Sequence, residues 1–98
     1  MKFYVLEGSF VENHPTGEAF KKALDAHHEY MDVGLKDGSV LISGPKVGAK
    51  GGVIVVKTDD IVGFCNNDPF VKEGVQEYRV SEFSMFDCQD FVEGWFKK

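Results

Sequence analysis

Hydrophobic residues recur at intervals of three and four between positions 19 and 36, which is the spacing of one face of an amphipathic helix. The members of this face are Phe20, Ala23, Leu24, Met31 and Leu35. Successive residues turn by about 100° around a helix, so His27 falls near the middle of this face and His28 at its edge. The pattern therefore predicts that His27 points into the interior, whereas His28 is able to reach solvent.

Four segments have the apolar pattern of β-strands, and two of them are apolar on both faces. These two are residues 2–7 and 53–57, so we expect them to be inner strands of the sheet. Residues 39–43 form a short strand that the following Gly-Pro pair ends. Residues 76–83 mix polar and apolar positions, as an edge or interface strand does.

Turn-forming residues separate these segments. Gly8 and Ser9 end the first strand, and Thr16 is placed to cap the helix at 19–36. The glycine-rich loop 44–52 joins two strands. A phosphate-binding loop would instead lead into a helix, so we expect a hairpin connection that also borders a pocket.

A second, shorter helix is predicted at residues 61–66, with Asp59 and Asp60 as capping residues. The side chains expected to face the sheet are Ile61, Val62, Phe64 and Cys65. The helix ends before Asp68, because a residue that precedes proline is pushed out of the helical region. Residues 70–74 then form a turn or a short helical piece. The order is strand, helix, strand, strand, helix, strand.

This order is the split βαβ pattern of ferredoxin-like α+β folds, whose helices cover one face of the sheet. Tyr4, Leu6, Ile54 and Val56 form one apolar set of the inner strands, and their alternates form another. Two short helices cannot cover both sets. A second copy of the chain would cover the remaining face, so we expect a homodimer.

A single domain is expected over residues 1–98, because 98 residues with 43% hydrophobic content suffice for one core but not for two. Residues 84–98 form a C-terminal extension of this domain. Its large apolar residues are Met85, Phe86, Phe91, Val92, Trp95 and Phe96. Such a segment packs either on the sheet edge of its own domain or on a dimer partner. The sequence leaves both alternatives open.

Charge and composition argue against several classes of protein. The net charge is −5 and the lysines are scattered, so neither nucleic acid nor a membrane surface is an expected partner. No apolar run approaches the roughly 20 residues of a membrane span, and no signal-peptide pattern is evident, so a cytoplasmic protein is expected. Cys65 and Cys88 share no motif and have no metal-ligand spacing to a histidine. We expect reduced thiols and no metal site.

Several short motifs occur in order along residues 1–83. They are His27 with Tyr30-Met31, Gly38, Ile42-Ser43-Gly44-Pro45, Gly51-Gly52-Val53-Ile54, Asp68-Pro69-Phe70 and Glu82-Phe83. This ordered set resembles the YCII-related (YciI-like) family of small α+β proteins. The resemblance implies a ferredoxin-like dimeric α+β barrel, in which the sheets of two subunits face each other.

The resemblance also implies an active site in which a histidine of the first helix lies beside the aspartate of the Asp-Pro turn. On this chain these residues are His27 and Asp68. Leu24 departs from the family pattern, since many relatives have a basic residue one turn before the histidine. Lys46 and Lys50 in the glycine-rich loop are the available cations if the ligand is an anion.

A carboxylate that accepts one imidazole N–H leaves the other ring nitrogen as a general base near neutral pH. No nucleophile, zinc, P-loop or dinucleotide motif accompanies the pair. We therefore expect a cofactor-free lyase or isomerase acting on a small cyclic or aromatic compound, and the resemblance suggests dehydrohalogenase-like chemistry. His27 and Asp68 are the candidate catalytic residues. The expected ligand contacts are Tyr4, Tyr30, Gly44, Pro45, Lys46 and Phe70.

Two other interpretations stay open. The same barrel cavity suits a non-catalytic dimeric module that binds a small hydrophobic ligand. His27 could also be a hydrogen-bonded core residue and Asp68 a turn cap, as such residues often are. The enzyme interpretation requires that the two side chains lie within hydrogen-bond distance beside a pocket open to solvent.

Overall fold

A computed structural model describes residues 1–97. Its elements are β1 (Lys2–Phe10), α1 (Gly17–Asp37), β2 (Val40–Pro45), β3 (Gly52–Thr58), α2 (Ile61–Asn66), α3 (Pro69–Lys72), β4 (Gln76–Phe83), the 3-10 turn η1 (Asp90–Val92) and α4 (Glu93–Lys97). Lys98, the last residue of the predicted C-terminal extension, lies outside the described residues. No helix of residues 1–97 is long and apolar enough to cross a bilayer.

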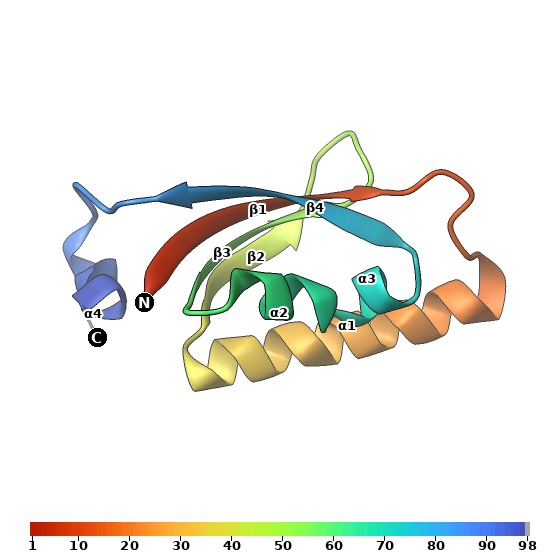
Figure 1. Ribbon diagram of the computed structural model, residues 1–98, viewed down its shortest axis with the longest axis horizontal. Coiled ribbons are helices and arrows are strands. Elements are labelled where there is room, and N and C mark those ends of the chain that lie inside the picture. The colour runs from red at the N-terminus through yellow and green to blue at the C-terminus, as the bar shows by residue number, and fades with distance from the viewer. Residues whose placement is uncertain (98) are drawn as a thin grey trace.

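The four strands form one antiparallel sheet in the order β2-β3-β1-β4. The helices α1, α2 and α3 lie on one face of this sheet, and the other face is left open over most of its length (Figure 1). This arrangement confirms the ferredoxin-like α+β fold. It also confirms that β1 and β3 are the inner strands and that β4 is an edge strand.

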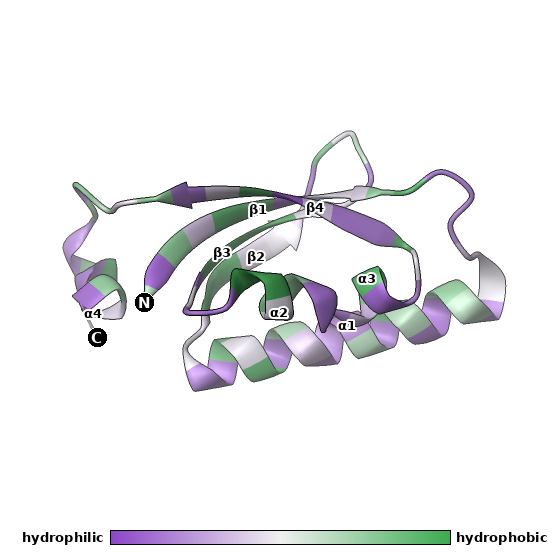
Figure 2. Ribbon diagram, in the orientation of Figure 1, coloured by the Kyte–Doolittle hydropathy of each residue, from purple (hydrophilic) through white to green (hydrophobic). Residues whose placement is uncertain are grey.

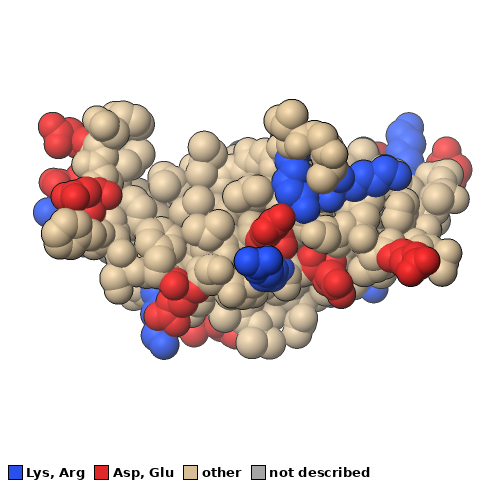
Figure 3. Space-filling view, turned by 90° about the horizontal axis from the view of Figure 1, so that it is seen from above, with Lys and Arg blue, Asp and Glu red and all other residues tan. Residues whose placement is uncertain are grey.

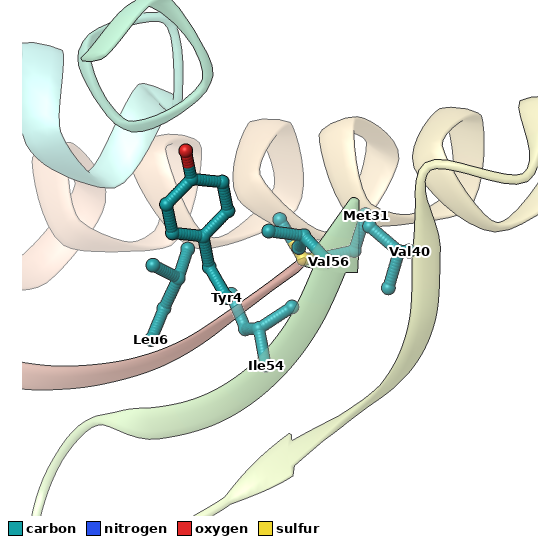
Figure 4. Close-up of a cluster of buried hydrophobic side chains, with 6 residues drawn as sticks. All are labelled: Tyr4, Leu6, Met31, Val40, Ile54 and Val56. Carbon is teal, nitrogen blue, oxygen red and sulfur yellow. The ribbon is translucent and has the colours of Figure 1, made fainter. Parts of the chain in front are cut away.

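The core lies between α1 and the two inner strands. Its buried members are Tyr4, Leu6, Met31, Val40, Ile54 and Val56, which converge between the helix and the sheet (Figure 4). The pairs Tyr4↔Val56 and Leu6↔Ile54 stand opposite each other in the β1/β3 ladder, so their side chains share a face. Figure 2 shows the hydrophobic residues concentrated on β1, β3 and α2, with alternating polarity along α1. The register thus selects which of the two apolar sets faces the helices.

Two strands continue past the residues that were predicted to end them. The first does not end at Gly8 and Ser9, because β4 supplies partners as far as Phe10, which pairs with Gln76. Likewise Gly44 and Pro45 do not break β2, because both pair with β3. Pairing with a neighbouring strand therefore outweighed the local turn signals.

Three predictions about the helices hold only in part. Thr16 stands at the N-cap of α1, but its side chain accepts no capping hydrogen bond. Of the two candidate caps of α2, Asp60 alone acts, accepting a hydrogen bond from the Gly63 N–H at 2.9 Å. Val62 does not face the sheet, since it is 67% exposed. The bounds of α2 agree with the prediction of residues 61–66.

The C-terminal segment returns to its own sheet beside the N-terminus (Figure 1). Trp95 and Phe96 pack on Phe3, with ring centroids 5.7 and 4.9 Å from it. The Trp95 indole N–H donates to the Gly38 carbonyl at 2.7 Å, and Lys57 Nζ donates to the Trp95 carbonyl at 2.6 Å. Phe86 and Phe91, by contrast, are 92% and 86% exposed. This end of the segment therefore packs within one subunit, while its earlier aromatics remain uncovered.

Candidate functional site

His27 and Asp68 lie together at the junction of α1 and α3. His27 Nδ1 is 2.8 Å from Asp68 Oδ1. The Asp68 side chain is fully buried, whereas the His27 side chain retains 14% of its exposure. The two residues are 41 positions apart, so the packing of α3 against α1 creates the contact.

The Asp68 carboxylate accepts three hydrogen bonds, from His27, from the Phe70 N–H at 2.9 Å and from the Tyr78 hydroxyl at 2.5 Å. Asp68 is also the N-cap of α3, and Pro69 is the first residue of that helix. The three hydrogen-bond donors and the N-terminus of α3 together fix the position of this carboxylate. Its Oδ1 is thereby directed at the imidazole.

An aromatic side chain packs against one face of the His27 ring. The imidazole stacks on Phe70, with centroids 4.3 Å apart and ring planes 5° from parallel. When Nδ1–H donates to Asp68, Nε2 carries the lone pair. Phe70 and Asp68 together thus define both the orientation and the tautomer of the imidazole.

A cavity of about 700 Å³ adjoins this pair. It lies between α1 and the β2–β3 side of the sheet, and His27 forms part of its wall. Most of the remaining wall is apolar, including Phe10, Phe20, Leu24, Met31, Ile54 and Phe70. Such an enclosure with few polar groups is typical of a site for a small molecule.

The predicted ligand contacts separate into two groups. Gly44, Pro45 and Phe70 line the cavity, as does Leu35, which is 48% exposed near the end of α1. Tyr4 is instead buried in the main core. It does not belong to the cavity wall that residues 1–97 form.

Tyr30 and Lys46 also lie outside the cavity wall, because both side chains have other partners. The Tyr30 hydroxyl donates to the Phe64 carbonyl at 2.8 Å, and burial, with the charge of Asp68, raises its pKa to about 12. Lys46 Nζ lies 3.3 Å from Glu7 Oε2 and 3.1 Å from Ser9 Oγ. The geometry brings neither residue to the cavity.

Sequence reasoning did not single out Tyr78 for the site. Tyr78 lines the cavity and donates to Asp68, and burial, followed by the charge of Asp68, raises the pKa of its hydroxyl. Its pairing with Gly8 puts it on the helix face of the sheet. The sequence signal that was available is that Tyr78 and Val80 are two positions apart in the predicted strand 76–83 and so share a face, but the register was needed to say which face that is.

Cys65 lies on α2 and packs against the core. Burial, together with the charge of Asp68, raises the pKa of its thiol to about 11. A thiol with a raised pKa is a poor nucleophile near neutral pH. No group of side chains in residues 1–97 has the composition and geometry of a metal site. The chemistry of the site therefore centres on the imidazole.

Comparison with known proteins assigns a family to this fold and site. The family model described as the YCII-related domain matches residues 2–84. The chain belongs to the YCII-related family. A search of curated proteins finds no match. The family match includes His27, Asp68 and Tyr78, and it ends where the C-terminal extension begins.

Proposed function

We propose that this YCII-related protein is a cytoplasmic, cofactor-free lyase or isomerase that acts on a small cyclic or aromatic compound bound in the cavity. His27 is the general acid/base, and Asp68 is the residue that positions it. The proposal rests on the 2.8 Å contact between His27 Nδ1 and Asp68 Oδ1, because His27 lines a cavity of about 700 Å³ while Asp68 is buried behind it. Dehydrohalogenase-like elimination is one reaction of this class.

In the proposed step, His27 Nε2 takes a proton from a carbon atom of the ligand, and Asp68 stabilises the imidazolium that forms. The electron pair of the broken C–H bond then forms a new C=C bond. In an elimination, a leaving group departs with its own bonding pair as an anion. In an isomerisation, the π pair of a C=C bond already present in the ligand shifts to a more distant carbon, and that pair takes the proton back from the imidazolium. Neither course requires a redox partner.

A second candidate is a non-catalytic module that binds a small hydrophobic ligand. The predominantly apolar wall of the cavity favours it, because apolar enclosure supplies affinity without any reacting group. In this case His27 and Phe70 would serve as part of the binding surface. Both candidates bind a ligand in the cavity, but only the enzyme converts it to a product.

The test is a screen of halogenated and hydroxylated aromatic compounds with the wild type, His27→Ala and His28→Ala. Loss of a general base lowers the rate by about 10²–10⁴-fold, so we expect His27→Ala to lose turnover while it retains binding. His28→Ala is the matched control, because His28 lines the same cavity but makes no hydrogen bond to Asp68. Turnover is followed by product formation and binding by calorimetry.

The outcomes separate the candidates. Equal binding by the wild type and His27→Ala, with turnover in neither, would favour the binding module. Turnover that survives in His27→Ala but not in His28→Ala would contradict the assigned role of His27.

We also propose that the protein is a homodimer that covers the open face of the sheet. This face carries Val5, Ile42, Val53 and Val55, of which Ile42 is 60% exposed and Val53 40% exposed. Trp95 and Phe96 pack on Phe3 at one end of the same face. Figure 3 looks onto this face: uncharged atoms cover much of it, whereas acidic and basic side chains lie together near its middle, with further basic side chains beside them. An apolar face of this kind supports association with a second sheet.

Val55→Lys places a charge in the middle of this face, so we expect it to halve the mass in solution from two chains to one. The measurement is light scattering coupled to size-exclusion chromatography. Val62→Lys is the control, because Val62 is exposed on α2, on the opposite side of the sheet. A wild type that elutes as a single chain would refute the dimer.

A further inference from the structure

The two lysines of the β2–β3 loop lie in different surroundings. The Lys46 N–H donates to the Gly51 carbonyl at 2.9 Å, which closes the loop across its base. Lys46 Nζ contacts Glu7 and Ser9 of β1, so an acidic neighbour already offsets its charge. Lys50, by contrast, lies in the wall of the cavity.

The backbone holds Lys50 in this position. The next residue, Gly51, has φ +111° and approaches β1 so closely that a Cβ atom built on it would lie 1.9 Å from the Gly8 carbonyl oxygen. A side chain could not occupy that place, so the loop is tied to β1 immediately after Lys50. The hydrogen bond between Lys46 and Gly51 and the close approach of Gly51 to β1 together fix the base of the loop.

The charge of the cavity wall differs from that of the whole chain. The net charge of the chain is −5. The ionisable side chains of the wall include the ammonium of Lys50 and the imidazoles of His14, His27 and His28, against one carboxylate, that of Asp32. Within residues 1–97, no carboxylate lies within ion-pair distance of Lys50. With the histidines neutral, as in the net charge of the chain, Lys50 and Asp32 balance, so an acidic protein has a cavity wall without net charge in which Lys50 is the cation.

We propose that Lys50 determines ligand specificity by binding the carboxylate of a ring compound. The apolar ring would lie against Phe20, Leu24 and Phe70, and the carboxylate would pair with the Lys50 ammonium. An ammonium beside an apolar wall interacts more strongly with a carboxylate than it does in open water. This inference rests on the proposed use of the cavity as a ligand site and narrows the ligand to an anionic ring compound.

The experiment compares 2-naphthoate with its neutral analogue 2-naphthamide by isothermal titration calorimetry. A hydrogen bond between an ammonium and a carboxylate is stronger than the hydrogen bond that a neutral amide makes. We expect the wild type to bind naphthoate about tenfold more tightly than naphthamide. Lys50→Met should abolish this preference, while it leaves the affinity for naphthamide unchanged.

Lys46→Met is the matched control, because it removes a lysine of the same loop whose ammonium is already paired with Glu7. This variant should keep the preference for naphthoate. The Lys50 side chain is exposed and the Lys46 side chain is 17% exposed, but neither belongs to a hydrophobic core cluster, and circular dichroism checks the fold of each variant. The preference should also weaken with rising salt in the wild type and not in Lys50→Met.

Three results would overturn the inference: equal binding of the two probes by the wild type, a preference that survives in Lys50→Met, or no binding of either probe. A preference lost equally in Lys46→Met would also count against it. None of these measurements involves turnover, so the role of His27 is judged separately. Loss of turnover in His27→Ala without a preference for naphthoate would leave the proposed reaction standing and remove only the assigned role of Lys50.

Discussion

Asp68→Ala is expected to lower the free energy of unfolding by about 3–5 kcal/mol, because each buried donor that loses its acceptor costs about 1–3 kcal/mol. The carboxylate is fully buried and accepts hydrogen bonds from His27, the Phe70 N–H and Tyr78. Removing it leaves these donors without their partner and also removes the N-cap of α3. Urea denaturation followed by circular dichroism measures the change.

Two further variants measure separate contributions to this loss of stability. Asp68→Asn keeps one side-chain oxygen that can accept the capping hydrogen bond, so it should be less destabilising than Asp68→Ala. Tyr78→Phe removes a single hydrogen bond to a charged acceptor, with an expected loss of about 1.5–3 kcal/mol. If Asp68→Ala unfolds at the same urea concentration as the wild type, the hydrogen bonds around Asp68 do not hold the fold together.

Gly51→Ala is expected to lower the free energy of unfolding by about 3 kcal/mol, through backbone strain and a steric clash together. Gly51 has φ +111°, which side chains rarely permit, and a Cβ atom would lie 1.9 Å from the Gly8 carbonyl oxygen. The loop would have to move away from β1. Because Lys50 precedes Gly51, we also expect this variant to lose much of the preference for naphthoate.

Gly48→Ala distinguishes the cost of backbone strain from the cost of the steric clash. Gly48 belongs to the same loop and has φ +80°, but no atom lies within 4 Å of a Cβ built on it. Its substitution should therefore cost only the strain of a positive φ, about 1 kcal/mol. Thermal and urea unfolding of both variants give the comparison. Equal losses at the two positions would mean that the close approach to Gly8 is not what restricts Gly51.

The residues that sequence reasoning placed correctly are those whose environment is set by near neighbours. His27 was singled out because the residues around it on one helix face are apolar, and α1 does carry it between two buried positions, Ala23 and Met31. The bounds of α2 and β4 followed from local composition in the same way. Amphipathic periodicity extends over a few turns of chain, so it can be read directly from the sequence.

The errors involve contacts between distant segments. The predicted ends of β1 and β2 were wrong because ladder partners were available beyond the local turn formers. Tyr78 was not expected at the site because its face depends on the register of β4 against β1. The alternation of two residues along a strand is visible in the sequence, but which of them faces the helices is not.

The loop lysines show the same limit. The sequence presents Lys46 and Lys50 as equivalent cations in one glycine-rich segment. The folded chain places Lys46 beside Glu7 and Lys50 in the cavity wall. No pattern within the loop distinguishes them, because the distinction comes from the approach of Gly51 to β1.

Local sequence patterns, with the family motifs, were sufficient to predict the α+β fold, the inner strands and an imidazole within the apolar face of α1. Only the tertiary structure shows how the site is built. Asp68 contacts His27, 41 positions away in the chain, and Tyr78 of the edge strand β4 donates a hydrogen bond to Asp68. Lys50 lines the cavity. The physical reason is that side-chain periodicity is a property of each segment, whereas strand register, helix packing and loop closure depend on contacts between segments.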